Sequence, residues 1–324
     1  MTTVSLNPGA AHLTDWRAIL DGATASLSGE SAKNIASGQK IVEEIVAAGT
    51  VTYGVNTGFG KLASVRIADA DLAKLQSNLI LSHAVGTGPA LPDGVVRLLL
   101  AMKAASLARG ASGVRPVVIE ALTNALKADA LPVIPAKGSV GASGDLAPLA
   151  HMTAALMGYG EIRLKGETLP AAEALKRAGL ATLALGAKEG LALINGTQVS
   201  TTLALTGLAA IARVFDAALV AGALSVDALK GSDTPFDPRI QSLRGQPGQI
   251  KVAALLLDLV AGSEIRESHR FGDSKVQDPY SLRCQPQVMG AVRDLLGNAA
   301  ATLAIEANAV TDNPLVLGPG EIVS

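Results

Sequence analysis

The sequence predicts a mainly α-helical protein: a bundle of long helices that follows a smaller N-terminal domain of helices and loops. Three observations lead to this fold class. Hydrophobic residues make up 49% of the 324 residues and aromatic residues only 2%, so the apolar side chains are aliphatic and suit closely packed helices. Apolar side chains recur at helical spacing in most segments. Glycine and proline stand where these periodic segments stop.

The first 127 residues contain four predicted helices, each from aliphatic side chains three and four positions apart: residues 31–48, 71–83, 94–109 and 116–127. Gly49 ends the first of them, and Pro116 suits the first turn of the last. We place a domain boundary near residues 110–113, where two glycines interrupt the pattern. This gives an N-terminal domain at residues 1–110 and a central helical bundle at residues 111–324.

The pattern changes after the fourth of these helices. Residues 131–149 hold three prolines and three glycines and are predicted to form a loop of small residues, from which a helix continues to Met157. Residues 161–166 are typical of a short hairpin. Further helices are then expected at residues 171–178, 198–229, 249–263 and 287–307.

The charge content limits the classes of partner. The chain has 27 Lys+Arg against 28 Asp+Glu, a net charge of −1, which argues against nucleic acid or a membrane surface held by bulk charge. Charged residues are 17% of the chain, against roughly 25% in an average soluble domain. We therefore expect a large subunit interface, or a missing segment that covers apolar surface. The single cysteine, Cys284, excludes an internal disulfide framework and a cysteine-based metal cluster.

Two segments bear on localisation. Residues 1–20 have no basic stretch before their apolar residues, and Asp15 interrupts them, so they do not read as a signal peptide. The uncharged run at residues 190–212 is long enough to span a bilayer. Its seven polar side chains, Asn195 and Gln198 among them, favour a helix buried in a protein bundle. We expect a soluble cytoplasmic protein with no membrane partner.

The segment most suggestive of chemistry is residues 138–151, Gly-Ser-Val-Gly-Ala-Ser-Gly-Asp-Leu-Ala-Pro-Leu-Ala-His. Taken locally, it is a flexible loop before a helix, with Asp145 as the N-cap. Ala142-Ser143-Gly144 also has the residue types needed for backbone cyclisation, because glycine and alanine do not crowd attack of the glycine nitrogen on the carbonyl two residues back. Loss of water from the serine would then leave a methylidene electrophile beside a helix N-terminus.

The longer string resembles the signature of the aromatic amino acid ammonia-lyase family, with the histidine ammonia-lyases as the closest match. This resemblance implies a 4-methylidene-imidazol-5-one (MIO) group formed autocatalytically from Ala142, Ser143 and Gly144. The family chemistry requires no metal and no diffusible cofactor.

A second family string lies at residues 52–60, Thr-Tyr-Gly-Val-Asn-Thr-Gly-Phe-Gly. By composition it is an ordinary hairpin-like loop with a half-buried Tyr53, although its three glycines would allow lid motion. The string is similar to the family loop that carries the catalytic tyrosine, which implies that Tyr53 removes the β-proton of the substrate. A free phenol with a pKa near 10 is a poor base at pH 7, so this role requires positive potential or hydrogen bonds at a phenolate.

His83 continues the leucine face of the helix predicted at residues 71–83, and on that ground alone a packed histidine at a helix C-terminus is favoured. The resemblance implies instead that His83 faces the substrate side chain and helps to set selectivity. The Ser82-His83 pair is similar to histidine-type members. Tyrosine-specific relatives also carry a histidine nearby, so the pair favours histidine as the substrate but does not exclude tyrosine.

Asn195, in the string Leu-Ile-Asn-Gly-Thr-Gln, stands at the mouth of an uncharged helix, where it is either a cap or a binding group. The resemblance implies that it contacts the substrate and the prosthetic group. The string Thr-Asp-Asn-Pro-Leu at residues 311–315 reads locally as a turn. The resemblance places it near the active site, with Asn313 and Asp145 as supporting residues.

Residues 277–287, Gln-Asp-Pro-Tyr-Ser-Leu-Arg-Cys-Gln-Pro-Gln, read locally as a loop that enters a helix, with a surface arginine. The density of amide, phenol and guanidinium groups points to more, because an arginine clamps a carboxylate bidentately. By resemblance, Arg283 binds the substrate α-carboxylate, Tyr280 lies beside the prosthetic group and Gln277 supports the site.

The resemblance covers almost the whole chain and implies non-oxidative deamination of L-histidine, as in histidine catabolism, to urocanate and ammonia. It also implies a homotetramer with shared active sites, which agrees with the low charge content. The same-class alternative is a tyrosine or phenylalanine ammonia-lyase or a related aminomutase. The alternative from another class is an inactive truncated fragment that acts only as a folding or assembly partner.

The chain departs from the family at its end. It stops at Ser324, where the family continues through a Gly-Gly-Asn-Phe-His-Gly type segment, more bundle helices and a substrate-facing glutamate. We therefore expect an N-terminal portion of a family member. We also expect it to be inactive or weakly active alone, unless a separate C-terminal portion complements it.

Overall fold

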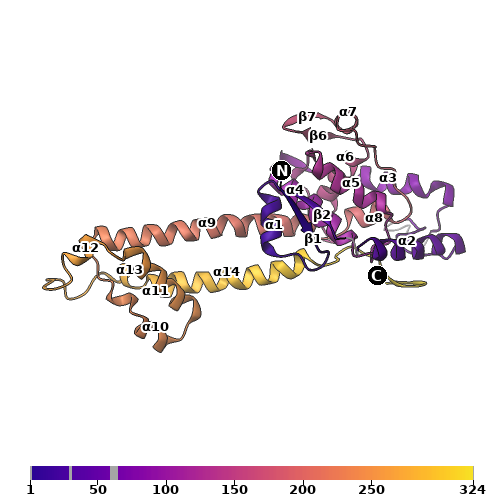
Figure 1. Cartoon of the computed structure of the whole chain (residues 1–324). Coiled ribbons are helices and arrows are strands. Elements are labelled where there is room, and N and C mark those ends of the chain that lie inside the picture. The colour runs from indigo at the N-terminus through magenta and orange to yellow at the C-terminus, as the bar shows by residue number, and fades with distance from the viewer. Residues whose placement is uncertain (1, 29–30, 59–64, 324) are drawn as a thin grey trace. The chain divides into compact units, whose positions relative to one another are not determined.

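The computed structural model describes residues 2–28, 31–58 and 65–323 of the chain (Figure 1). Helices form most of its secondary structure, so the predicted mainly α-helical class is confirmed. The chain divides into two compact units: unit 1 comprises Met1–Ala204 with Ala304–Ser324, and unit 2 comprises Leu205–Leu303. The boundary suggested by the sequence at residues 110–113 lies inside unit 1.

Unit 1 is built from short and medium helices with small sheets between them. Its helices are α1 (Leu13–Leu20), α2 (Ser31–Ala48), the 3₁₀ turn η2 (Asp69–Asp71), α3 (Leu72–His83), α4 (Asp93–Leu107), α5 (Pro116–Lys127), α6 (Leu146–Leu156), α7 (Ala171–Arg177) and α8 (Glu189–Ile194). Its strands are β1 (Thr3–Leu6), β2 (Thr24–Leu27), β3 (Thr87–Ala90), β4 (Ala130–Pro132), β5 (Pro135–Lys137), β6 (Glu161–Leu164), β7 (Glu167–Pro170), β8 (Leu315–Gly318) and β9 (Glu321–Val323).

The sheets of unit 1 are small and mostly antiparallel. β1 pairs with β2 in parallel, whereas β3–β5, β4–β6–β7 and β8–β9 are antiparallel. The predicted hairpin is β6–β7, and helices α2 and α5 begin and end at the predicted residues. The sequence does not predict β1–β2, β3–β5 or β8–β9, because strands of three or four residues are too short to show an alternating pattern.

Helix α4 forms the centre of unit 1. Every side chain from Val95 to Leu107 except Arg97 is buried. Helices α1 and α5 pack against α4, while α3, α6 and α8 pack against one another. A helix that is apolar all round requires burial all round, so the one charged side chain among these buried positions, Lys103, needs a particular explanation.

Two long helices, α9 (Gln198–Ala228) and α14 (Gln285–Ala307), contribute residues to both units. The remaining elements of unit 2 are η3 (Thr234–Phe236), α10 (Pro238–Arg244), α11 (Pro247–Val260), α12 (Glu264–Glu267) and α13 (Tyr280–Arg283). Prolines at the first turns of α10 and α11 suit those positions, because the missing N–H would have no partner in the helix.

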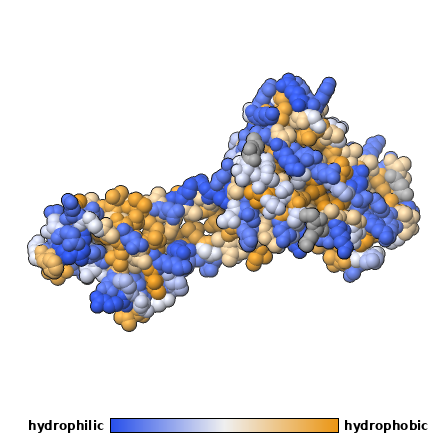
Figure 2. Space-filling model, viewed as in Figure 1, coloured by the Kyte–Doolittle hydropathy of each residue, from blue (hydrophilic) through white to orange (hydrophobic). Residues whose placement is uncertain are grey.

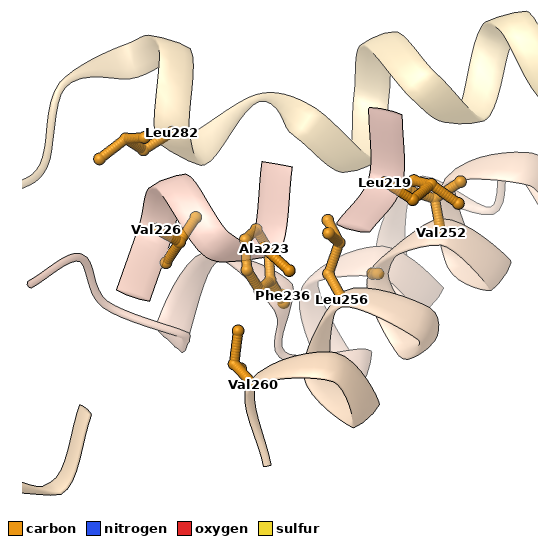
Figure 3. Packing of buried hydrophobic residues seen from close by; sticks show 9 residues of the cluster. Leu219, Ala223, Val226, Phe236, Val252, Leu256, Val260 and Leu282 are labelled. Carbon is orange, nitrogen blue, oxygen red and sulfur yellow. The ribbon is translucent and has the colours of Figure 1, made fainter. Parts of the chain in front are cut away.

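Unit 2 has its own hydrophobic core, shown in Figure 3. Side chains of α9 and α11 face one another, and Phe236 of η3 is completely buried beneath them. The core consists of Leu219, Ala223, Val226, Phe236, Val252, Ala253, Leu256, Val260 and Leu282.

Large apolar side chains also remain exposed on unit 2, and Figure 2 shows hydrophobic patches on its visible face. Helix α9 exposes Val214 and Leu224, and helix α14 exposes Leu295. In length and composition, α9 and α14 would each suffice to cross a membrane, with mean hydropathies of 1.8 and 1.2 over their most apolar windows. These two properties do not establish a span, because helices of a soluble bundle share them.

The unit 2 core gives a stability prediction. Leu256→Ala should lower the free energy of unfolding by about 2–5 kcal/mol, because it removes a fully buried side chain and leaves a cavity. Leu243→Ala is the matched control at a position that is 91% exposed, and it should change stability by about 0.5 kcal/mol or less. Urea unfolding followed by circular dichroism measures both, and equal losses in the two variants would contradict the core described above.

Candidate active site

Ser143 lies in a turn between β5 and α6 whose backbone is strained. Its φ is +57°, and the φ of Gly144 is +95°, so both residues are in the left-handed region. For serine this conformation costs about 1–2 kcal/mol, and such strain is typical of functional sites. Ala142 and Ser143 are both exposed, so the turn presents them at the surface of the chain.

The turn rests on the backbone of Gly196, which lies between α8 and α9. Gly144 and Gly196 form an isolated parallel bridge, and the Asp145 N–H donates to the Gly196 carbonyl at 2.8 Å. A Cβ at position 144 would lie 2.5 Å from the Gly196 oxygen and 2.7 Å from its nitrogen. Only glycine fits this contact, so the close approach explains why the residue after Ser143 has no side chain.

The carboxylate of Asp145 does not cap the helix it precedes, contrary to the local interpretation of the sequence. It is buried and accepts from the Ser139 hydroxyl at 2.7 Å, the Ser200 N–H at 2.8 Å and the Ser200 hydroxyl at 2.5 Å. Ser200 is in the first turn of α9, so Asp145 caps α9. The N-terminus of α6 has no side-chain cap, and its partial positive charge lies next to the Ser143 turn.

Asn195 follows the last residue of α8 and precedes Gly196, so it lies beside the same turn. Its carbonyl accepts a hydrogen bond from Lys103 Nζ at 2.7 Å. Lys103 is completely buried, and its ammonium group also lies 3.4 Å from Gln198 Oε1. A buried lysine of α4 thus holds the backbone of the segment that carries Asn195.

The loop that carries Tyr53 is fixed by its neighbours. Asn56 is fully buried, accepts from the Thr52 N–H at 2.8 Å and donates to the Thr50 carbonyl at 2.8 Å. Gly54 packs so closely on α8 that a Cβ there would lie 2.6 Å from Leu191 Cδ2.

Gly54 also brings the Tyr53 loop against residues 311–315. A Cβ at Gly54 would lie 3.0 Å from Pro314 Cδ, and Pro314 directly follows the half-buried Asn313. Tyr53 itself is 36% exposed. Phe59 and Gly60, the last residues of the predicted tyrosine string, lie outside the described residues.

His83 is the last residue of α3 and is half-buried. Its Nδ1 lies 2.8 Å from the Leu79 carbonyl, which only accepts, so we assign a proton to Nδ1; in the tautomer with this proton, Nε2 is the acceptor. The segment after His83 is tied to α6, because the Gly86 N–H donates to His151 Nε2 at 3.0 Å. Partial burial lowers the pKa of His151, which favours the neutral ring that accepts this bond.

The 311–315 string contributes more than its asparagine. Thr311 Oγ1 accepts from the Thr197 N–H at 3.1 Å and from Gln198 Nε2 at 3.0 Å. Asp312 is buried, accepts from the Ser112 hydroxyl at 2.8 Å and lies 3.6 Å from Lys188 Nζ.

Hydrophobic periodicity and turn signals do not reveal the roles of Lys103, Gln198, Thr311 and Asp312. Each of these residues belongs to a segment whose sequence is typical of an apolar helix or of a turn. The sequence signal for Lys103 is that it is the one charged residue between Leu98 and Leu107.

The remaining predicted residues, Gln277, Tyr280 and Arg283, belong to unit 2. They line a cavity of about 910 Å³, together with basic side chains of Arg266 and Lys275. The Arg283 guanidinium lies 5.2 Å from the centre of the Tyr280 ring, within range of a cation–π contact, and its Nε donates to the Asp278 carbonyl at 2.9 Å. This bond uses one of five N–H donors, and the guanidinium can offer the others to an anion.

Unit 1 therefore brings together the Ser143 turn, Asn195, the Tyr53 loop and the 311–315 string, while unit 2 holds a second group of its own. The sequence of residues 11–324 matches the model of a known family, described as aromatic amino acid lyase.

The chain belongs to the aromatic amino acid lyase family.

Solved structures of three relatives resemble this lyase-family chain closely. A phenylalanine aminomutase from Pantoea agglomerans is 32% identical with a TM-score of 0.89, over 99% of this chain and 65% of that one. A histidine ammonia-lyase from Trypanosoma cruzi is 32% identical with a TM-score of 0.89, over 100% and 61%. A tyrosine aminomutase from Streptomyces globisporus is 33% identical with a TM-score of 0.89, over 98% and 64%. The lyase-family chain thus spans about three fifths of the length of these relatives.

The contact between Gly144 and Gly196 gives a prediction for the lyase fold. Gly144→Ala and Gly141→Ala both place alanine at a positive φ, at +95° and +69°. A Cβ at Gly141 has no atom within 4 Å, whereas one at Gly144 collides with the Gly196 backbone. We expect Gly144→Ala to cost about 1–3 kcal/mol more than Gly141→Ala in urea unfolding. Indistinguishable losses would show that the two backbones do not meet.

His151 gives a pH prediction. Because its pKa is lowered in the folded chain, the unfolded chain binds more protons at acidic pH, so stability should fall as the pH drops below 6.5. His151→Gln keeps a hydrogen-bond acceptor but does not titrate. The free energy of unfolding, measured at about pH 7.5 and about pH 5, should therefore fall less in this variant than in the wild type. Equal falls would refute the role of the neutral ring.

Proposed function

We propose that this chain serves the ammonia-lyase reaction of its family and that its substrate is L-histidine, which would yield urocanate and ammonia. One observation carries the proposal: the Ser143 turn, held in the left-handed region against Gly196, beside an uncapped helix N-terminus. The strain and the close approach are the features expected of a segment that must react with itself.

The residues present fit the prosthetic group that we expect from Ala142, Ser143 and Gly144. Consecutive positive φ angles fold the segment back on itself, and the missing side chain at Gly144 leaves its nitrogen uncrowded. When formed, the MIO group supplies an electrophilic carbon for the substrate amine. The uncapped N-terminus of α6 adds positive potential at this position, and Asp145 supports the turn through its N–H bond to Gly196.

The other residues of unit 1 have roles that follow from their chemistry. Tyr53 is the base that takes the β-proton, and the fixed loop around Asn56 limits where its phenol can go. Asn195 orders the substrate beside the Ser143 turn. His83 offers the acceptor Nε2 to the N–H of a substrate imidazole, since its Nδ1 proton is engaged by Leu79. Asn313 supports the Tyr53 loop through the neighbouring proline.

In unit 2, Arg283 binds the α-carboxylate of the substrate, Tyr280 lies against the Arg283 guanidinium and Gln277 lines the same cavity. A bidentate guanidinium–carboxylate contact would fix the substrate orientation. We propose that these residues serve active sites shared within a homotetramer. The apolar side chains exposed on α9 and α14 support this proposal, because they are surface that a neighbouring subunit would cover.

The choice of histidine over tyrosine or phenylalanine rests on Ser82 and His83. The identities to the three relatives, 32%, 32% and 33%, do not separate the substrates. We also propose a cytoplasmic enzyme without membrane or nucleic-acid partners. The balanced charge of the chain supports this proposal, and so do the polar side chains of Gln198, Thr201 and Thr202, which are buried in unit 1 at the start of α9.

The proposal is tested by intact mass and by product. Wild-type chain should be lighter than its sequence mass by two water molecules, because ring closure and serine dehydration each release one. Ser143→Ala should have its full sequence mass and no activity. Tyr53→Phe should keep the two-water loss but lose activity by about a hundredfold or more, because it lacks the base.

Histidine, tyrosine and phenylalanine should be assayed side by side, with the chain alone and mixed with the C-terminal part of a relative. Urocanate release supports the histidine assignment. Cinnamate or coumarate release without urocanate would favour the tyrosine or phenylalanine alternative. An unmodified wild-type mass, with no product from the chain alone or from the mixture, would leave only a folding or assembly role.

A further inference from the structure

Lys103 is a charged side chain buried among apolar neighbours in unit 1. It is fully buried in α4, between Met102 and Ala104, which are buried as well. Transfer of an ammonium group from water into such an interior is costly unless it is paired or hydrogen-bonded. Burial accordingly lowers the pKa of Lys103 to about 8. A leucine or methionine would fill the same space without that cost, so the charge requires a reason beyond packing.

The ammonium group of Lys103 has a specific target. It donates to the Asn195 carbonyl at 2.7 Å, with Gln198 Oε1 as a second acceptor at 3.4 Å. Asn195 is the C-cap of α8, where the helix dipole is negative, so the cation is placed at the end of α8 that it stabilises. Three other titratable groups act on Lys103: Asp312 and Asp145 favour its charged form, and Lys188 opposes it.

The segment that Lys103 holds is the one on which the Ser143 turn rests. The Asn195 carbonyl belongs to the peptide that precedes Gly196, and the next carbonyl along the chain, that of Gly196, accepts the Asp145 N–H at 2.8 Å. Gly144 bridges to the same Gly196. A rotation of the Asn195–Gly196 peptide would therefore break the contact with Lys103 and disturb the contact with Gly144 together.

We propose that Lys103 is a positioning residue: its ammonium group fixes the Asn195–Gly196 peptide, which in turn seats Ser143–Gly144–Asp145 and orients the Asn195 side chain. This inference rests on the proposed function for its catalytic meaning. Its structural content, that Lys103 controls the order of the turn, is measurable without activity.

Lys188 provides a matched control. It is also fully buried, and burial likewise lowers its pKa. Its ammonium donates to the Ser112 carbonyl at 2.7 Å and lies near Asp312, so it does not hold the Asn195–Gly196 peptide. Lys103→Met and Lys188→Met therefore remove the same kind of buried charge but differ in the carbonyl that loses its donor.

Amide hydrogen exchange, resolved to single residues in the folded chain, tests the inference. Lys103→Met should speed exchange of the Asp145 N–H by about tenfold or more, which is the effect of losing a hydrogen bond to a charged group on local opening. Lys188→Met should leave the Asp145 N–H as slow as in the wild type. Lys103→Gln is a second variant, which keeps a polar group in the site in case the methionine variant does not fold.

The outcomes separate this inference from the proposed function. Faster Asp145 exchange in the Lys103 variants alone, with a smaller fraction of chain that has lost two waters, supports the positioning role. Unchanged exchange in both Lys103 variants, or equal acceleration in Lys188→Met, overturns it. If exchange responds as expected but wild-type chain keeps its full mass, the structural inference holds and the proposed function fails.

Discussion

The Ser143 turn and the segment that carries Asn195 both depend on the junction at which Gly144 and Asp145 meet Gly196. At this point the start of α6, the end of α8 and the start of α9 are held within hydrogen-bonding distance of one another. The Asp145 N–H donates to the Gly196 carbonyl, and its carboxylate accepts from the N–H and the hydroxyl of Ser200. Asp145 therefore ties Gly196 to the first turn of α9. The left-handed conformation of Ser143 persists because these contacts leave the turn no relaxed alternative.

Three buried charged side chains near the junction have local partners. Asp145 is compensated by hydroxyl and amide donors, Lys103 by the Asn195 carbonyl, and Lys188 by Asp312 and the Ser112 carbonyl. Removing one partner from such a set costs more than the set contributes, because it leaves a charge buried without compensation. An arrangement of this kind does little for stability and favours a single geometry of the turn.

How much of this could be predicted from the sequence depends on the range of the interaction. Helices such as α2 and α5 were predictable to the residue, because their ends are set by local signals at Gly49 and Pro116. The use of Asp145 was not: as the residue before α6 it looks like an N-cap, and nothing in the local sequence places Ser200 next to it. Lys103 and Thr311 acquire their roles only when segments about 90 and 110 positions apart along the chain meet. Hydrophobic periodicity does not contain that information.

The low charge content of the chain has different structural counterparts in the two units. In unit 1, the charged side chains of Lys103, Asp145 and Lys188 are buried near the junction. They hold the backbone in place there and do not contribute to the polar surface. Unit 2 has a compact core of apolar side chains, and its long helices also expose Val214, Leu224 and Leu295. A monomer gains nothing from leaving these side chains in water. Large apolar side chains are exposed on unit 1 as well, Val85 and Val140 among them, so both units leave apolar surface in contact with water.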